Sequence, residues 1–204
     1  MDVLVIDIGG THVKLLATGQ DGPRAFVSGP TLTPRQMAAG VKKLGRGWVP
    51  FDYRAALGRP VKIINDAAMQ ALGSYRGGKM LFLGLGTGLG SALVVDGIVE
   101  PMELGHLPYR KGTYEAYVGQ RGLEQRGKKK WRRHVADVVA ALIAALEPDD
   151  VVLGGGNVKK LKELPPGCRA GVNANAFVGG ARLWEQAAPR LVRNDQERRR
   201  GIAS

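Results

Sequence analysis

The chain has 204 residues, of which 44% are hydrophobic and 24% charged, as expected for a soluble globular protein with one large or two small domains. Its single cysteine, Cys168, excludes an internal disulfide and a cysteine-based zinc site. The net charge is +12, of which +9 falls in residues 107–204, so this half favours polyanionic partners or simply serves solubility. The first residues lack the features of a signal peptide and no later segment could span a bilayer, so a cytoplasmic protein without membrane partners is expected.

The first third of the chain predicts a small sheet and one helix. Residues 3–8 (VLVIDI) and 13–18 (VKLLAT) form two strands joined by a glycine-rich turn, and a third short strand covers 24–28. A capping threonine, a proline and an apolar stripe predict a helix over 33–44. Segment 45–60 is rich in glycine and proline and is expected to be irregular.

The centre of the chain repeats the opening design. Val61–Ile64 is expected to be a buried strand that leads into a helix beginning at Asn65-Asp66. Residues 80–95 (MLFLGLGTGLGSALVV) again combine an apolar strand, a Gly-x-Gly turn with a threonine and a second strand, and Asp96-Gly97 turns the chain into a third. Two such units indicate an internal duplication.

The remainder predicts two longer helices around one more strand. Apolar residues at helical spacing predict a helix over 132–146, and 151–153 form a strand that ends at Gly154-Gly155-Gly156. Asn157 or the residue after it begins another helix, and 173–186 suit a last one.

The two glycine turns are the first candidates for chemistry. Gly9, Gly10 and Thr11 follow Asp7; glycines let backbone N–H groups approach a phosphate, and an aspartate suits Mg²⁺ through water. A plain β-turn explains this motif alone equally well. The second turn, Gly86-Thr87-Gly88, changes the balance, because two such turns can clamp a polyphosphate from both sides for phosphoryl transfer.

Carboxylates and a histidine lie near these turns in the sequence. Asp66, at a helix N-terminus, could accept the proton of an attacking hydroxyl or could merely be the helix cap. Glu103, His106 and Glu115 follow the second turn and offer the donors and acceptors that sugar hydroxyls require, although a lone histidine is more often structural.

Two further motifs lie in the basic half. The corner from Gly154 to Asn157 accepts a phosphate or a flat nucleoside, whereas a tight strand–helix turn needs only one glycine. Seven cations against one acid lie between Arg121 and Arg133, and such a run binds polyanions or is a solvated helix face.

Together these motifs resemble the ROK family of the actin/hexokinase-like superfamily, and most of all its polyphosphate-dependent glucokinases. The likeness rests on five motifs in the family's order: IDIGGTHVK, INDAAMQAL, GLGTGLGSALVVDG, ELGH with the later TYE, and VVLGGGN. It implies an α/β fold with two ribonuclease-H-like lobes, residues 1–79 and 80–186, followed by a basic tail over 187–204 that is expected to be disordered.

The resemblance also implies roles for single residues. Asp66 would be the general base for the 6-hydroxyl of glucose, and Asp7 would hold Mg²⁺. Donor phosphate would be held by Gly9, Gly10, Thr11, Lys14, Gly86, Thr87, Gly88, Gly154, Gly155, Gly156 and Asn157. The sugar would be bound by Asn65, Glu103, His106 and Glu115.

One departure from the family falls in the N-terminal lobe. The family has a core strand and a sugar-contacting loop where this chain has only Gly45–Pro60, so both are expected to be missing. The implied reaction is transfer of a terminal phosphoryl group from polyphosphate or ATP to glucose. The alternatives are an ATP-only hexose kinase and an inactive relative that binds sugar or polyanion. A nucleic-acid binder is disfavoured because no nucleic-acid module is recognisable, and a homodimer is left open.

Overall fold

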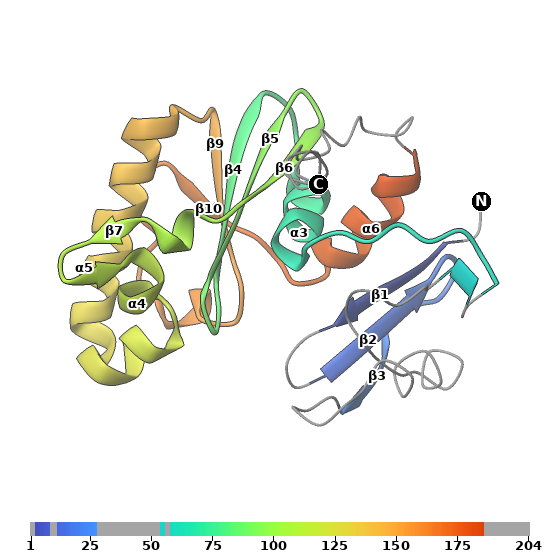
Figure 1. Ribbon diagram of the computed structural model, residues 1–204, viewed down its shortest axis with the longest axis horizontal. Helices are drawn as coiled ribbons and strands as arrows, with labels where there is room; N and C mark the ends of the chain where they lie inside the picture. Colours follow the sequence, from blue (N-terminus) through green and yellow to red (C-terminus); the bar gives the residue numbers. More distant parts are fainter. Residues whose placement is uncertain (1–2, 9–11, 28–53, 56–57, 186–204) are drawn as a thin grey trace, which may run out of the picture.

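The computed structural model describes residues 3–8, 12–27, 54–55 and 58–185, and all structural statements below refer to these ranges. They form a small N-terminal sheet and a larger sheet that lies between helices on both faces (Figure 1). The predicted helix over 33–44, most of the segment 45–60 and the tail 187–204 lie outside the described residues.

The N-terminal sheet confirms the predicted hairpin and third strand. Strands β1 (Leu4–Ile8), β2 (His12–Ala17) and β3 (Arg24–Val27) are antiparallel and lie in the order β1-β2-β3. The register pairs Asp7 with Lys14, so these two side chains project from the same face of the sheet.

The larger sheet has five strands in the order β10-β9-β4-β5-β6. Its bounds are β4 (Lys79–Leu85), β5 (Leu89–Val95), β6 (Ile98–Met102), β9 (Asp150–Gly154) and β10 (Cys168–Ala170). The first three form an antiparallel meander like β1 to β3, as a duplication of the opening unit would give, and β9 and β10 add parallel strands.

Helices cover both faces of this sheet, and alternating side chains of β4 explain why. Leu81, Leu83 and Leu85 pack against one helix layer, whereas Met80 and Phe82 pack against the other. The first layer contains α4 (Tyr114–Val118) and α5 (Gln120–Leu146); the second contains α3 (Asp66–Ser74), with α6 (Asn175–Glu185) lying on α3. None of the described helices is long and apolar enough to cross a bilayer.

Helix α5 is longer than predicted and is interrupted. Its apolar stripe over 132–146 is present, but helical residues begin at Gln120 and the backbone breaks at Gly127, with φ 70° and ψ 158°. The fully buried Trp131 anchors the chain beyond the break, because its Nε1 donates to the Val118 carbonyl at 2.7 Å. The polar residues 120–126 carry too few apolar positions to reveal a helix in the sequence.

The prediction of a buried strand at Val61–Ile64 is wrong. This segment is extended but has no ladder partner among the described residues, and Ile63 is 72% exposed. It is held instead by side chains: Lys62 Nζ donates to the Leu183 carbonyl at 2.5 Å, and Ile64 packs beside two apolar clusters of α3. An apolar run becomes a strand only where a neighbouring strand can receive its backbone hydrogen bonds.

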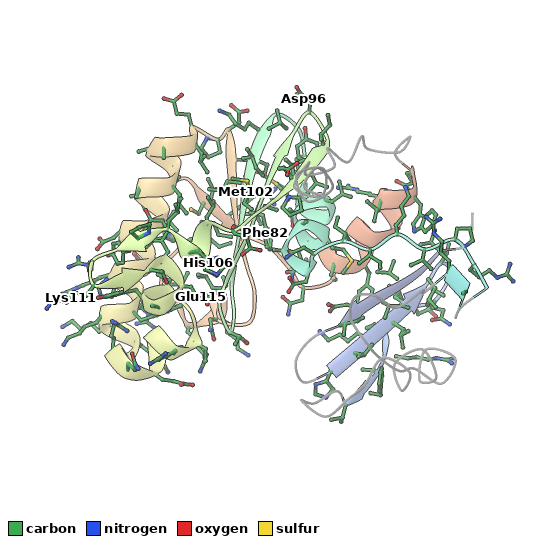
Figure 2. The ribbon with its side chains drawn as sticks, viewed as in Figure 1. Phe82, Asp96, Met102, His106, Lys111 and Glu115 are labelled. Carbon is green, nitrogen blue, oxygen red and sulfur yellow. The ribbon has the colours of Figure 1, made fainter. Side chains whose placement is uncertain are left out.

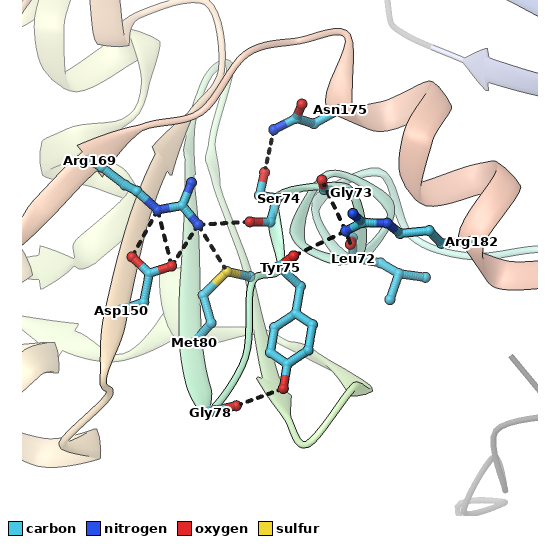
Figure 3. Close-up of polar contacts among 10 residues, drawn as sticks. All are labelled: Leu72, Gly73, Ser74, Tyr75, Gly78, Met80, Asp150, Arg169, Asn175 and Arg182. Atoms are coloured by element: carbon cyan, nitrogen blue, oxygen red, sulfur yellow. Dashed lines mark hydrogen bonds and ion pairs between the residues drawn. The ribbon is translucent and has the colours of Figure 1, made fainter. Parts of the chain in front are cut away.

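Two arginines fix the C-terminus of α3 (Figure 3). Four carbonyls at a helix end need partners outside the helix. Arg182 of α6 donates from Nη1 to those of Leu72, Gly73 and Tyr75 at 2.9, 3.4 and 3.1 Å. Arg169 donates to the Ser74 carbonyl at 2.7 Å while forming an ion pair with Asp150 at 2.6 Å. Helix α3 is therefore fixed to α6 and to strands β9 and β10.

Candidate functional site

The carboxylate of Asp7 lies near the end of β1, beside two other charged groups. Its Oδ2 is 3.6 Å from Lys14 Nζ, and Asp66 is close enough to act on it electrostatically. Burial, the largest influence, raises the pKa of Asp7; Lys14 lowers it, and the charge of Asp66 raises it. The adjacent Gly9, Gly10 and Thr11 lie outside the described residues, so their phosphate-binding role stays a prediction.

The structure separates the two interpretations of Asp66. The cap of α3 is Asn65, whose Oδ1 accepts from the N–H groups of Ala67 and Ala68 at 2.8 and 3.3 Å. Asp66 is the first helical residue and is exposed, with its Oδ1 also 2.8 Å from the Ala67 nitrogen. The helix therefore does not need Asp66 as its cap.

The second glycine turn is held from several sides. The Gln120 N–H donates to the carbonyls of Gly86 and Thr87 at 3.0 and 3.1 Å, and the Leu89 N–H donates to Glu115 Oε2 at 3.2 Å. A Cβ on Gly88 would collide with the Glu115 carboxylate, so any larger residue here would push that side chain away from the Leu89 N–H. Glu115, predicted to bind sugar, thus has one oxygen on the turn.

Two of the other sugar candidates, Glu103 and His106, lie at the two ends of a short helix that packs near Glu115, whereas the side chain of Asn65 caps α3. Glu103 precedes the short helix η1 (Leu104–His106), and its Oε2 is 3.9 Å from His106 Nδ1, with both side chains more than 70% exposed. A Cβ on Gly105 would lie 3.5 Å from the Cβ of Glu115, which places η1 against α4. In Figure 2, His106 and Glu115 occupy neighbouring positions in this region. Beyond η1, strands β7 (Pro108–Tyr109) and β8 (Gly112–Thr113) form a hairpin that leads into α4.

The first turn of α3 packs next to the second glycine turn. A Cβ on Gly90 would lie 3.0 Å from Cβ of Ala67, so the first turn of α3 packs directly on the start of β5. The structure therefore brings Asp66, the second glycine turn and Glu115 into one region, with Asp7 of β1 near enough to feel the charge of Asp66.

The glycines at the end of β9 have different reasons to be glycine. A Cβ on Gly154 would lie 2.5 Å from the Phe82 ring, and Gly155 has φ +85° and would meet the Leu85 carbonyl at 2.5 Å. Only Gly156 faces open space. The predicted helix after them is a short 3-10 turn, η2 (Val158–Lys160), and Asn157 is buried. Packing thus explains two of the three glycines, and the donor-binding role of the corner stays a prediction.

Sequence reasoning missed Gln120. Its backbone N–H holds the second turn, and its side-chain Oε1 accepts from Asn157 Nδ2 at 3.1 Å. No motif singled it out; the only available signal was its place directly after Gly119, at the start of a helix.

The donor set at Asp7 fits a magnesium ion. No three metal-binding side chains gather anywhere in the described part of the chain. Mg²⁺ in phosphoryl transfer commonly uses one or two carboxylates and completes its shell with water and donor phosphates. The carboxylate of Asp7, with Asp66 nearby, meets that requirement.

Neutralising Asp7 should stabilise the fold. Its folded-state pKa lies above the unfolded value, so the ionised form costs stability, and this cost disappears as the pH falls through the folded-state pKa. We expect Asp7→Asn to have a higher urea midpoint than the parent at pH 7.5, with the two midpoints converging toward pH 4. The matched control is Asp21→Asn at an exposed turn. A lower midpoint for Asp7→Asn at pH 7.5 would mean that the ion pair with Lys14 outweighs burial.

The fold was compared with solved structures. The inorganic polyphosphate/ATP-glucomannokinase from Arthrobacter sp. strain KM superposes with a TM-score of 0.73 at 22% identity, over 88% of this chain and 96% of that one. A ROK family glucokinase from Streptomyces griseus, in complex with glucose and AMPPNP, superposes with a TM-score of 0.69 at 15% identity, over 90% and 99%. This chain has the ROK fold. The resemblance drawn from the motifs and the predicted two-lobed fold class are thereby confirmed.

Sequence relatives agree with the ROK fold. Polyphosphate glucokinase of Mycobacterium tuberculosis is 27% identical over 172 residues, which is 72% of this chain and 61% of that protein. The bifunctional enzyme NanE/NanK of Brucella melitensis is 27% identical over 155 residues, 53% of this chain and 30% of that protein. The chain thus spans less than two thirds of these relatives, and no family model matches it.

The ROK fold is not confined to kinases. A ROK family transcriptional regulator also superposes, with a TM-score of 0.66 at 15% identity, over 89% of this chain and 77% of that one. The fold alone therefore does not decide between catalysis and binding.

Proposed function

We propose that this protein is a sugar kinase that transfers a terminal phosphoryl group from polyphosphate or ATP to the 6-hydroxyl of glucose. The observation that carries the proposal is the position and exposure of Asp66. It is an exposed carboxylate at a helix N-terminus whose capping is done by Asn65, and its helix packs on the first residues of β5, directly after the second glycine turn. A carboxylate beside a phosphate-binding turn is what general-base phosphoryl transfer requires.

In this mechanism each group has one task. Asp66 accepts the proton of the attacking hydroxyl. Glu103, His106 and the second carboxylate oxygen of Glu115 orient the sugar. The turn at Gly86–Gly88 and Lys14 neutralise donor charge, and Asp7 would hold Mg²⁺, which would supply further positive charge against the negative charge that develops during transfer. Positioning and charge neutralisation supply most of the rate.

One coupled assay tests the proposal. Glucose 6-phosphate formation is followed with purified protein, glucose and Mg²⁺, in parallel with ATP and with polyphosphate. Product with polyphosphate supports the polyphosphate-dependent assignment, and product with ATP alone supports the ATP-only hexose kinase. Product with neither donor would overturn the catalytic proposal.

The second candidate is an inactive relative that binds sugar or polyanion. The observation in its favour is the segment Val61–Ile64, which leads into Asp66 but pairs with no strand in the described part of the chain. The start of α3 is therefore not fixed by a strand that belongs to a sheet. Small displacements of a catalytic group are costly, and about 1 Å can reduce the rate about 100-fold. Calorimetric binding of glucose without product in the coupled assay would favour this candidate.

Substitutions in the basic run of α5 test whether polyphosphate is the donor. Lys128, Lys129 and Lys130 are exposed and follow the backbone break at Gly127, at the start of the second helical segment of α5. Replacing all three with alanine should raise the KM for polyphosphate about 10-fold at low ionic strength, because a long donor extends beyond the glycine turns. The KM for ATP should change much less.

A matched variant controls for net charge. Arg24, Arg76 and Lys111 are exposed cations on other elements, and their joint replacement with alanine should leave both KM values close to the parent. If the α5 variant changed the KM for both donors equally, the basic run would be a solvated helix face and not a polyphosphate-binding surface.

A further inference from the structure

Asn157 is one of few polar side chains buried in the described part of the chain, with 5% of its surface exposed. Its Nδ2 donates to the Gly86 carbonyl at 3.0 Å and to Gln120 Oε1 at 3.1 Å. Its backbone N–H donates to the Leu85 carbonyl at 2.9 Å. The residue that follows the glycines of β9 is therefore joined at its backbone and its side chain to the end of β4 and to the start of α5.

These bonds decide which groups the second glycine turn presents. The carbonyls of Gly86 and Thr87 accept from Gln120 and Asn157, so both oxygens are engaged by the protein. The N–H groups of Thr87 and Gly88, by contrast, have no acceptor among the described residues. A turn whose carbonyls are engaged and whose successive N–H groups are free is suited to an anion.

We propose that Asn157 is a positioning residue for the donor-binding turn, acting through the Gly86 carbonyl and Gln120 rather than by contacting the donor. The inference rests on the proposed function in one respect, namely that this turn holds donor phosphate. Without the amide donor of Asn157, the Gly86 carbonyl would retain only the Gln120 N–H, and the turn could rotate a carbonyl toward the phosphate.

The decisive variant is Asn157→Asp. It preserves shape but replaces the amide donor with a carboxylate that faces two acceptor oxygens. When protonated, the carboxyl can again donate one hydrogen bond. Burial raises its pKa, whereas two neighbouring cations lower it: Lys160, whose Nζ is 3.4 Å from Gln120 Oε1, and Arg132, whose Nε donates to the Lys160 carbonyl. We therefore expect the dissociation constants for AMPPNP and for tripolyphosphate, measured by calorimetry, to rise about 10-fold at pH 8 and to recover toward the parent at pH 5.5. The dissociation constant for glucose should stay within about twofold.

Hydrogen exchange gives a readout that needs no ligand. In Asn157→Asp at pH 8 the amides of residues 86–90 should exchange faster, while those of α6 stay unchanged. Asn173→Asp, at an exposed asparagine before α6, makes the same charge change and should alter neither measurement. If Asn157→Asp does not fold, Gln120→Ala is the second variant: it keeps the backbone N–H that bonds to the turn but removes the Oε1 that holds Asn157 Nδ2, and it should weaken AMPPNP binding without affecting glucose.

The outcomes separate this inference from the proposed function. A parent that binds AMPPNP or tripolyphosphate but forms no glucose 6-phosphate would overturn catalysis and still test Asn157. Three results would overturn the positioning role. Asn157→Asp could lose donor and glucose binding equally, its dissociation constant for the donor probes relative to the parent could be the same at pH 8 and pH 5.5, or the parent could bind neither probe.

Discussion

Replacing Asp66 with asparagine is expected to lower the rate of glucose phosphorylation by at least about 100-fold, because general-base catalysis contributes about 10²–10⁴ to such reactions. The substitution keeps the shape of the side chain and one oxygen for the Ala67 N–H, but removes the proton acceptor. The helix should not suffer, since Asn65 supplies the cap. Glucose binding by calorimetry and the thermal midpoint should therefore remain close to the parent while turnover disappears.

Asp96→Asn is the matched control for this experiment. Asp96 is an exposed turn residue with φ 49°, a conformation that asparagine also tolerates, and it lies at the opposite end of β5 from the second glycine turn (Figure 2). This variant should keep full activity. If Asp66→Asn retained more than about a tenth of the parent rate, Asp66 would not be the general base.

Among the substitutions proposed for this chain, Gly179→Ala, which adds one methyl group, is expected to lower the free energy of unfolding the most. Helices α3 and α6 pack so closely that a Cβ at this position would collide with the Met69 carbonyl and lie 2.9 Å from the Gly73 nitrogen. Both atoms are backbone, so no side-chain rotation relieves the collision. Overpacking of this kind costs about 1–3 kcal/mol, which urea unfolding of Gly179→Ala would measure.

The same change should reach the candidate site. Forcing α6 away from α3 moves the Arg182 guanidinium from the three carbonyls that it holds at the end of α3, the helix that begins with Asp66 (Figure 3). We expect the residual folded protein to lose turnover as well. Gly22→Ala, where a Cβ would meet nothing within 4 Å, is the matched control. Unchanged stability of Gly179→Ala would mean that the two helices can separate without cost.

Local pattern was enough to predict much of this chain. A hairpin is predicted by the apolar residues of β4 and β5 together with the turn residues between them, whatever the rest of the chain does. The same holds for β1 and β2. Five short motifs in one order along the chain led to the ROK likeness that the superpositions support. These features depend on residues that are neighbours in the sequence, so the amino-acid sequence alone is enough to predict them.

Long-range contacts decided the rest. Val61–Ile64 has the composition of a strand and is not one, because backbone pairing needs a partner that the described sheet does not provide. Nothing in the sequence could assign the helix cap to Asn65 rather than Asp66, or show that Asn157 points inward to Gly86 across 71 positions of chain. A side chain's donors and acceptors are satisfied by whatever the fold brings near them, and that neighbourhood exists only once the sheets and helices have packed.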